Sequence, residues 1–156
     1  MPNHALNLTL SLTSTPDDNA VQRVQAGLAA HNALHAEADG YEPLCIFLHD
    51  AAGETVGGLL GNTYWGWLNI SILWLREDAR HGGYGKRMVQ MAEAEAIRRG
   101  CNYAHVDTLD FQAPDFYRQL GYTVWGQLDD LPPGHTRYFM RKTLSVQTAP
   151  PTHGVD

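Results

Sequence analysis

The chain of 156 residues has only two cysteines, no long hydrophobic run and no excess of basic residues, and each absence excludes a class of protein. Cys45 and Cys101 are too few for a disulfide framework and are typical of small buried residues in a reducing compartment. No apolar stretch approaches the length of a membrane span, and no basic segment followed by an apolar one opens the chain. The formal net charge of −6 argues against nucleic acid as the main partner and favours a cationic substrate. We therefore expect a cytoplasmic protein that acts away from membranes and nucleic acids.

The length and the 44% hydrophobic content fit one domain with a single core. We expect this domain over residues 1–144, followed by a mobile polar tail over 145–156. The hydrophobic periodicity predicts strands at 6–12, 44–48, 55–60, 67–75, 103–108, 122–128 and 137–144. Capping residues predict helices that begin at Asp17 or Asp18, near Tyr84 and at Pro114. From this pattern alone the fold is α/β or α+β.

Three glycines lie within residues 80–86, where an apolar strand meets the next predicted helix. Glycines let the backbone approach an anion closely, and the first N–H groups of a helix carry its positive dipole end. The stretch is not a P-loop, because Arg87 stands where Ser or Thr is required. A dinucleotide-binding fingerprint would need a small residue at the position of Met88. The loop is therefore a phosphate-binding candidate of another kind.

Residues 80–85 have the pattern Arg-x-x-Gly-x-Gly, which resembles the pyrophosphate loop of the GCN5-related N-acetyltransferases. Residues 113–122 resemble the second signature of that family, an Ala followed four positions later by a Tyr and then by Gly-Tyr. The two motifs occur in the order and spacing of the family, and the resemblance covers residues 44–144. It implies the acetyltransferase fold, a mixed α/β, mostly antiparallel seven-stranded sheet with splayed central strands and helices on both faces.

The resemblance also implies acetyl-CoA as the cofactor and N-acetylation of a primary amine, expected to belong to a small molecule, without an acetyl-enzyme. In the family the glycine loop holds the pyrophosphate, and the preceding strand bonds the pantetheine arm. The implied cofactor-binding residues are Leu73, Trp74, Leu75, Arg80, His81, Gly82, Gly83, Tyr84, Gly85, Lys86, Asp110 and Gln112. Asp110 stands where the family usually has an Asn, and an ionised carboxylate accepts but cannot donate a hydrogen bond. Gln112 is the candidate substitute.

Tyr117 is the candidate general acid, because the family uses a Tyr at this motif position to protonate the departing thiolate. The ordinary pKa values of a phenol and a thiol, about 10 and about 8.5, suit this transfer. Leu75 is the candidate for a backbone N–H that stabilises the oxyanion. Asp107, Asp110 and Glu77 are candidates for accepting the proton of the amine, and Asp107 is favoured by its place near the expected splay. The alternatives are a tyrosine packed with its hydroxyl bonded locally, and an aspartate that is only a solvated strand-end acid.

Aromatic and polar side chains that could line an acceptor pocket are Trp65, Trp67, Asn69, Ser71 and His135. Roles in the core or in exposed turns explain these residues equally well. Two other functions stay open, a non-catalytic acyl-CoA-binding module and a protein N-acetyltransferase. A pure binding module has no need for an acid at position 117, so Tyr117 favours an enzyme. No metal is expected, since the helical pair His31 and His35 lacks further ligands, and a homodimer stays open.

Overall fold

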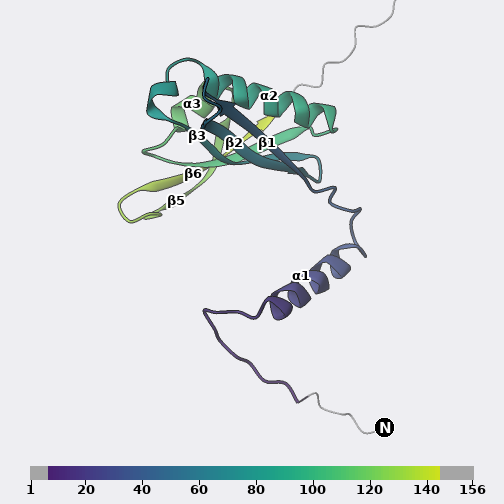
Figure 1. Cartoon of the computed structure of the whole chain (residues 1–156). Coiled ribbons are helices and arrows are strands. Elements are labelled where there is room, and N and C mark those ends of the chain that lie inside the picture. The colour runs from purple at the N-terminus through teal and green to yellow at the C-terminus, as the bar shows by residue number, and fades with distance from the viewer. Residues whose placement is uncertain (1–6, 145–156) are drawn as a thin grey trace, which may run out of the picture. The chain divides into compact units, whose positions relative to one another are not determined.

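The structure is a computed structural model that describes residues 7–144, and the chain divides into two compact units after residue 38 (Figure 1). The first unit contains α1 (Asp18–Asn32). Its N-cap is Asp17, whose carboxylate accepts a hydrogen bond from the backbone N–H of Ala20 at 2.9 Å. The helix therefore begins where the capping pattern predicts.

The strand predicted at residues 6–12 is wrong, because residues 7–12 belong to no strand and residue 6 lies outside the described residues. Leu8, Leu10 and Leu12 are exposed. A period-two pattern makes a strand only where a partner strand takes up its backbone hydrogen bonds. The predicted tail over 145–156 lies outside the described residues.

The second unit is built on a mixed sheet of six strands in the order β1-β2-β3-β4-β6-β5. The strands are β1 (Glu42–His49), β2 (Thr55–Tyr64), β3 (Trp67–Leu75), β4 (Tyr103–Leu109), β5 (Thr123–Asp129) and β6 (Thr136–Thr143). Only β3 and β4 pair in parallel, and the other neighbours are antiparallel. The expected mixed α/β sheet is confirmed, with six strands among the described residues instead of seven.

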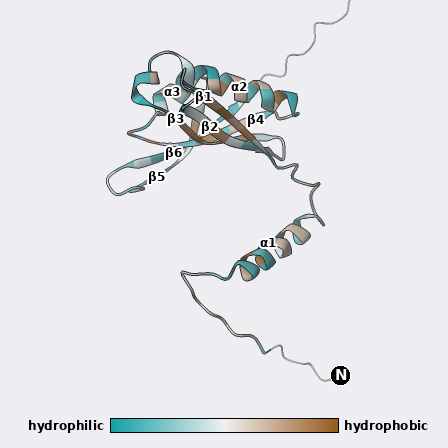
Figure 2. Cartoon of the chain, viewed as in Figure 1, coloured by the Kyte–Doolittle hydropathy of each residue, from teal (hydrophilic) through white to brown (hydrophobic). Residues whose placement is uncertain are grey.

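The helices of this unit are α2 (Tyr84–Arg98) and α3 (Pro114–Gln119), preceded by a 3₁₀ turn, η1 (Glu77–Ala79). Both helices lie on one face of the sheet (Figure 1). Figure 2 shows hydrophobic residues along the strands beside them and polar residues over much of α2. The helix buries a stripe of Met88, Val89, Ala92 and Ala96, as its sequence predicts.

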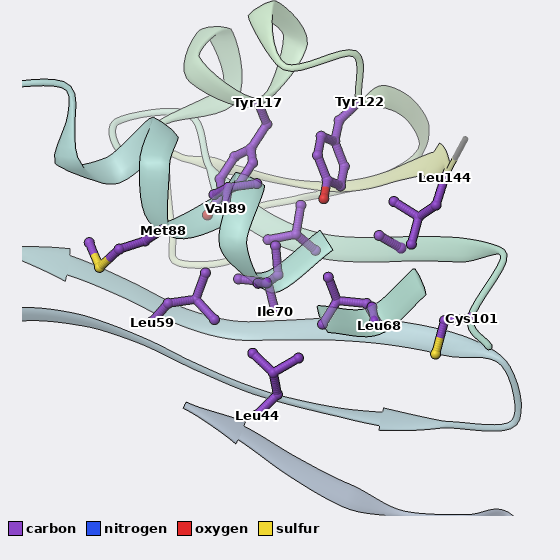
Figure 3. Close-up of a cluster of buried hydrophobic side chains, with 14 of the residues drawn as sticks. Leu44, Leu59, Leu68, Ile70, Met88, Val89, Cys101, Tyr117, Tyr122 and Leu144 are labelled. Atoms are coloured by element: carbon purple, nitrogen blue, oxygen red, sulfur yellow. The ribbon is translucent and has the colours of Figure 1, made fainter. Parts of the chain in front are cut away.

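The core lies between these helices and the sheet (Figure 3). Leu59, Leu68 and Ile70 of the strands meet Val89 of α2 there, and all four are almost completely buried. Such burial contributes about 1.5–3 kcal/mol for each large apolar side chain. The core therefore fixes α2 above β3, which places the N-terminus of α2 beside the end of that strand.

The sheet opens between β3 and β4. The two strands pair only over Trp67–Ile70 and Tyr103–Val106, so their C-terminal halves have no ladder between them. At the same point β3 carries a bulge against β2, because Leu60 pairs with Ile72 and Gly61 with Ile70. Ser71 is the extra residue, and bulges of this kind bend a strand and re-aim its peptide groups. The predicted splay is therefore present and begins just after Ile70.

Candidate active site

The glycine loop ends in a helix N-terminus without a side-chain cap. Gly83 is the N-cap of α2 with φ +77°, and a Cβ added there would meet nothing within 4 Å. The backbone N–H groups of residues 81–86 have no hydrogen-bond acceptor among the described residues, the first helical bond being that from Arg87 to Gly83. Unpaired amides and the positive helix end together form an anion-binding site. The loop can therefore hold a phosphate through its backbone.

The other loop glycine, Gly85, has a different role. It is buried, and a Cβ at this position would point at Phe116 Cζ, 3.4 Å away, and at Leu75 Cδ1, 3.7 Å away. This glycine lets α2 approach α3 and the end of β3 closely. A Cβ at Gly83, by contrast, would point into open space. A larger side chain would therefore disturb helix packing at Gly85 but not at Gly83.

The end of β3 presents one unpaired edge. Leu73, Trp74 and Leu75 pair with β2 on one side, and the edge toward β4 has no ladder after Ile70. Arg80 folds back onto this end, because its Nε donates to the carbonyl oxygen of Leu75 at 3.0 Å. A flexible ligand arm can therefore add to this edge by backbone hydrogen bonds.

Tyr117 of α3 is 4% exposed, and its ring packs 5.6 Å from that of Tyr122. In Figure 3 both rings point from the α3 side into the core. The Tyr122 hydroxyl donates to Glu93 at 3.0 Å, whereas that of Tyr117 forms no hydrogen bond within the described part of the chain. Burial, with the Asp107 carboxylate nearby, raises the pKa of Tyr117 to about 12. Its ring is packed, as the alternative interpretation expects, but its hydroxyl is not bonded locally.

Asp107 lies in β4 just beyond the start of the splay and pairs with Arg137, whose Nε is 3.2 Å from a carboxylate oxygen. Two residues earlier, His105 points to the same side of the strand, the side opposite α2 and α3. Burial lowers the pKa of His105 below its ordinary value, and Asp107 opposes part of this shift. His105 is therefore a second titratable group near the splay, and burial favours its neutral form.

Asp110 and His135 bind each other. One Asp110 carboxylate oxygen lies 2.9 Å from His135 Nδ1, and the other accepts from the Thr136 N–H at 3.1 Å. Burial raises the pKa of Asp110, but these hydrogen bonds outweigh it and lower the pKa overall. Gln112 accepts from the Leu109 N–H at 3.1 Å. Asp110 and Gln112 therefore already form hydrogen bonds near the turn between β4 and α3. Their contacts with a cofactor stay predictions.

Two of the predicted acceptor residues, Trp65 and Trp67, line a cavity of about 490 Å³. The other lining residues are Tyr64, His105, Trp125 and Arg141. Of the remaining predicted acceptor residues, Asn69 donates to Ser71 Oγ at 3.1 Å, and His135 is bound to Asp110 instead of lining the cavity. The aromatic part of the prediction therefore converges on one site.

Comparisons with known proteins agree with this arrangement. Residues 13–122 match the model of the acetyltransferase (GNAT) family. The chain belongs to that family. A blasticidin-S acetyltransferase of Streptomyces morookaense is 39% identical over 109 residues, which cover 69% of this chain and 80% of the relative. An acetyltransferase of Agrobacterium fabrum is 30% identical over 131 residues, 84% of this chain and 96% of that protein. A crystal structure of an acetyltransferase from Bacillus cereus superposes with a TM-score of 0.78 at 28% identity, covering 86% and 98% of the two chains.

The chain is therefore a GNAT acetyltransferase that uses acetyl-CoA for N-acetylation. The unpaired amides of residues 81–86 and the unpaired edge of β3 fit this cofactor, since they offer donors for its pyrophosphate and its pantetheine amides. Within residues 7–144 no helix of this acetyltransferase is long and apolar enough to cross a membrane. In the same range no group of three His, Cys, Asp or Glu side chains is arranged to hold a metal ion.

Four residues of the aromatic cavity were missed from the sequence, namely Tyr64, His105, Trp125 and Arg141. His105 and Arg141 could have been found from strand alternation, because they place their side chains on the same side of neighbouring strands of this acetyltransferase. That inference needs the order of β4 and β6 in the sheet, which periodicity does not provide. Trp125 lies at a bulge of β5, where alternation fails as a guide.

Proposed function

We propose that the chain transfers the acetyl group of acetyl-CoA to a primary amine of a small molecule by direct attack on the thioester. The observation that carries the proposal is the loop of unpaired amides at the N-terminus of α2, which lies beside the unpaired edge of β3. The loop would bind the pyrophosphate, and Arg80 and Lys86 would add positive charge. The edge of β3 would bind the pantetheine arm and direct a backbone N–H, with Leu75 as candidate, at the developing oxyanion.

In this proposal Tyr117 protonates the departing thiolate. Its pKa of about 12 keeps the phenol protonated at neutral pH, and among the described residues its hydroxyl has no partner that would compete for the donor. Asp107, the favoured candidate, or His105 beside it, would take the proton of the attacking amine. Neither cysteine lies at the splay, since Cys45 is in β1 and Cys101 follows α2, which supports attack without an acetyl-enzyme.

A small molecule is favoured as the acceptor because the relative from Streptomyces morookaense is named for an antibiotic, blasticidin-S. A cavity of about 490 Å³ also has the size of a small-molecule site. A protein N-acetyltransferase would instead need a groove for an extended peptide. The test is release of the CoA thiol from acetyl-CoA with a panel of small primary amines and, in parallel, with peptides that carry a free N-terminus.

The matched variants for this test are Gly83→Val and Gly53→Val. Both glycines have positive φ, +77° and +80°, and neither has an atom within 4 Å of an added Cβ, but only Gly83 lies in the loop. We expect Gly83→Val to lose acetyl-CoA binding in calorimetry and all thiol release, because a β-branched residue changes the loop conformation. Gly53→Val should keep both activities. Equal acetyl-CoA affinity in the two folded variants would refute the assignment of the loop.

A further inference from the structure

The aromatic cavity has a composition that selects among amines. Trp67 of β3 lines it: the indole stacks on Tyr103 with 4.7 Å between the ring centroids, and His105 meets the indole edge-on at 5.8 Å. Tyr64 holds His105 through a hydroxyl to Nε2 distance of 3.4 Å. Trp125 of β5, which is 59% exposed, adds a further indole to the lining. Three indoles and a phenol among the six lining residues favour a flat, unsaturated ring.

The charged side chains of the lining favour a ligand with an anionic group. Arg141 of β6 lines the cavity, and its guanidinium has no ion pair or hydrogen bond to any other described residue. No Asp or Glu is among the lining residues, and the only other titratable cation candidate, His105, has its pKa lowered by burial. The nearest acid of β4, Asp107, pairs with Arg137 instead. The cavity therefore presents one unpaired cation with a planar fork of donors that matches a carboxylate.

This local charge opposes the inference from composition. The net charge of −6 favours cationic substrates at long range, but salt screens such fields beyond about 8 Å under physiological conditions. Selection inside a cavity depends on the groups that contact the ligand. A polycationic amine would lose its hydration in the cavity without gaining a carboxylate from the lining residues. It would also be repelled by Arg141.

The cavity also lies at the right place for transfer. His105 pairs in register with Asn69, one position before the last paired residues of β3 and β4, Ile70 and Val106. The first residue of β4 beyond the ladder, Asp107, is two positions after His105. At about 3.3 Å per residue along a strand, a ligand beside His105 is therefore ~7 Å from the start of the splay. A second, larger concavity of about 830 Å³ shares Trp67 and Arg141 but extends toward Tyr103 and Thr143, away from the splay.

We infer that the acceptor is an amine carried on a planar unsaturated ring system that also bears an anionic group, the ring packing on Trp67 and Trp125 and the anion pairing with Arg141. The inference rests on the proposed function, because it takes the cavity to be the acceptor site of the acetyl transfer. It makes Arg141 and Trp125 specificity-determining residues, which neither the two family motifs nor the predicted acceptor residues include.

The test measures binding, so that it does not depend on turnover. Calorimetry compares indole-3-acetate, which has a ring and a carboxylate, with the isosteric neutral indole-3-acetamide and with the polycation spermidine. We expect indole-3-acetate to bind about tenfold more tightly than the amide, which is the usual contribution of one charge-assisted pair, and spermidine not to bind. Arg141→Gln should abolish the difference between acid and amide, and Trp125→Leu should weaken both. Arg98→Gln, at the far end of α2, is the control and should change neither.

Equal affinities for the acid and the amide, tighter binding of spermidine, or an unchanged preference in Arg141→Gln would each overturn the inference. Trp125 is largely exposed, so its replacement tests the ring contact even if a change at Trp67 prevents folding. Thiol release with amines is measured separately. Acetyl transfer without the acid preference would leave the proposed function standing and refute this acceptor class, whereas the acid preference without transfer would refute the transfer reaction and keep the binding site.

Discussion

Among single residues, Tyr117 combines a buried ring with a hydroxyl that no described group binds. Removing that hydroxyl should change the chemistry and leave the packing intact. We expect Tyr117→Phe to lower kcat by on the order of a hundredfold with little change in acetyl-CoA affinity, as for a general acid that acts in the transition state. Because the pKa is raised to about 12, the wild-type rate should not fall on account of this group up to about pH 10. Steady-state kinetics across pH measures both effects.

The control for this variant is Tyr122→Phe, the same substitution in the neighbouring ring. The Tyr122 hydroxyl is bound to Glu93, which also accepts from Lys142 Nζ at 2.9 Å. Its loss should lower thermal stability and leave kcat unchanged, because this cluster ties α2 to β6. If Tyr117→Phe turns over at the wild-type rate while chemistry limits the reaction, Tyr117 is only a packing residue.

At the scale of elements, the C-terminal end of α2 is joined to the sheet by a network around Glu95. Its carboxylate accepts from Arg98 Nε at 2.7 Å and Arg99 Nε at 2.8 Å. Arg99 Nη1 in turn donates to the carbonyl oxygen of Pro43 at 3.1 Å and to Thr63 Oγ1 at 3.2 Å. Hydrogen bonds from Arg98 and then Arg99 lower the pKa of Glu95 from its ordinary 4.5 to about 2. The network thus anchors the helix to β1 and β2.

A carboxyl group with a lowered folded-state pKa stabilises the fold fully above its unfolded pKa and loses this effect as pH falls through the folded value. Glu95→Gln should therefore unfold more easily than the wild type at pH 7, and the difference should disappear between about pH 4.5 and 2. Urea unfolding at a series of pH values measures it. Glu54→Gln is the control. Glu54 is exposed, and its ion pair with Arg76 is weak because the two charged atoms are as far as 3.6 Å apart. A difference for Glu95→Gln that persists unchanged at pH 2 would contradict this assignment.

At the scale of the whole molecule, most elements of the sheet unit follow from the sequence. Gly53, Gly100 and Pro114 mark the boundaries of the neighbouring elements, and the glycine loop precedes α2 as predicted. The first strand was mispredicted because alternation says nothing about the availability of a partner strand. The aromatic cavity was predicted only in part for a related reason, since Trp67, His105 and Arg141 meet only after β6 inserts beside β4.

The short parallel ladder between β3 and β4 has a consequence for how the chain folds. It joins two antiparallel halves, β1-β2-β3 and β4-β6-β5, and its partners lie far apart in sequence, with α2 between them. Closing such long loops costs entropy before any contact is gained, so this seam should limit the folding rate. Val106→Ala in the seam should slow refolding, whereas the matched Val56→Ala in β2 should mainly speed unfolding, as measured by stopped-flow kinetics in denaturant. Unchanged refolding and faster unfolding in Val106→Ala would place the closing of the seam after the rate-limiting step.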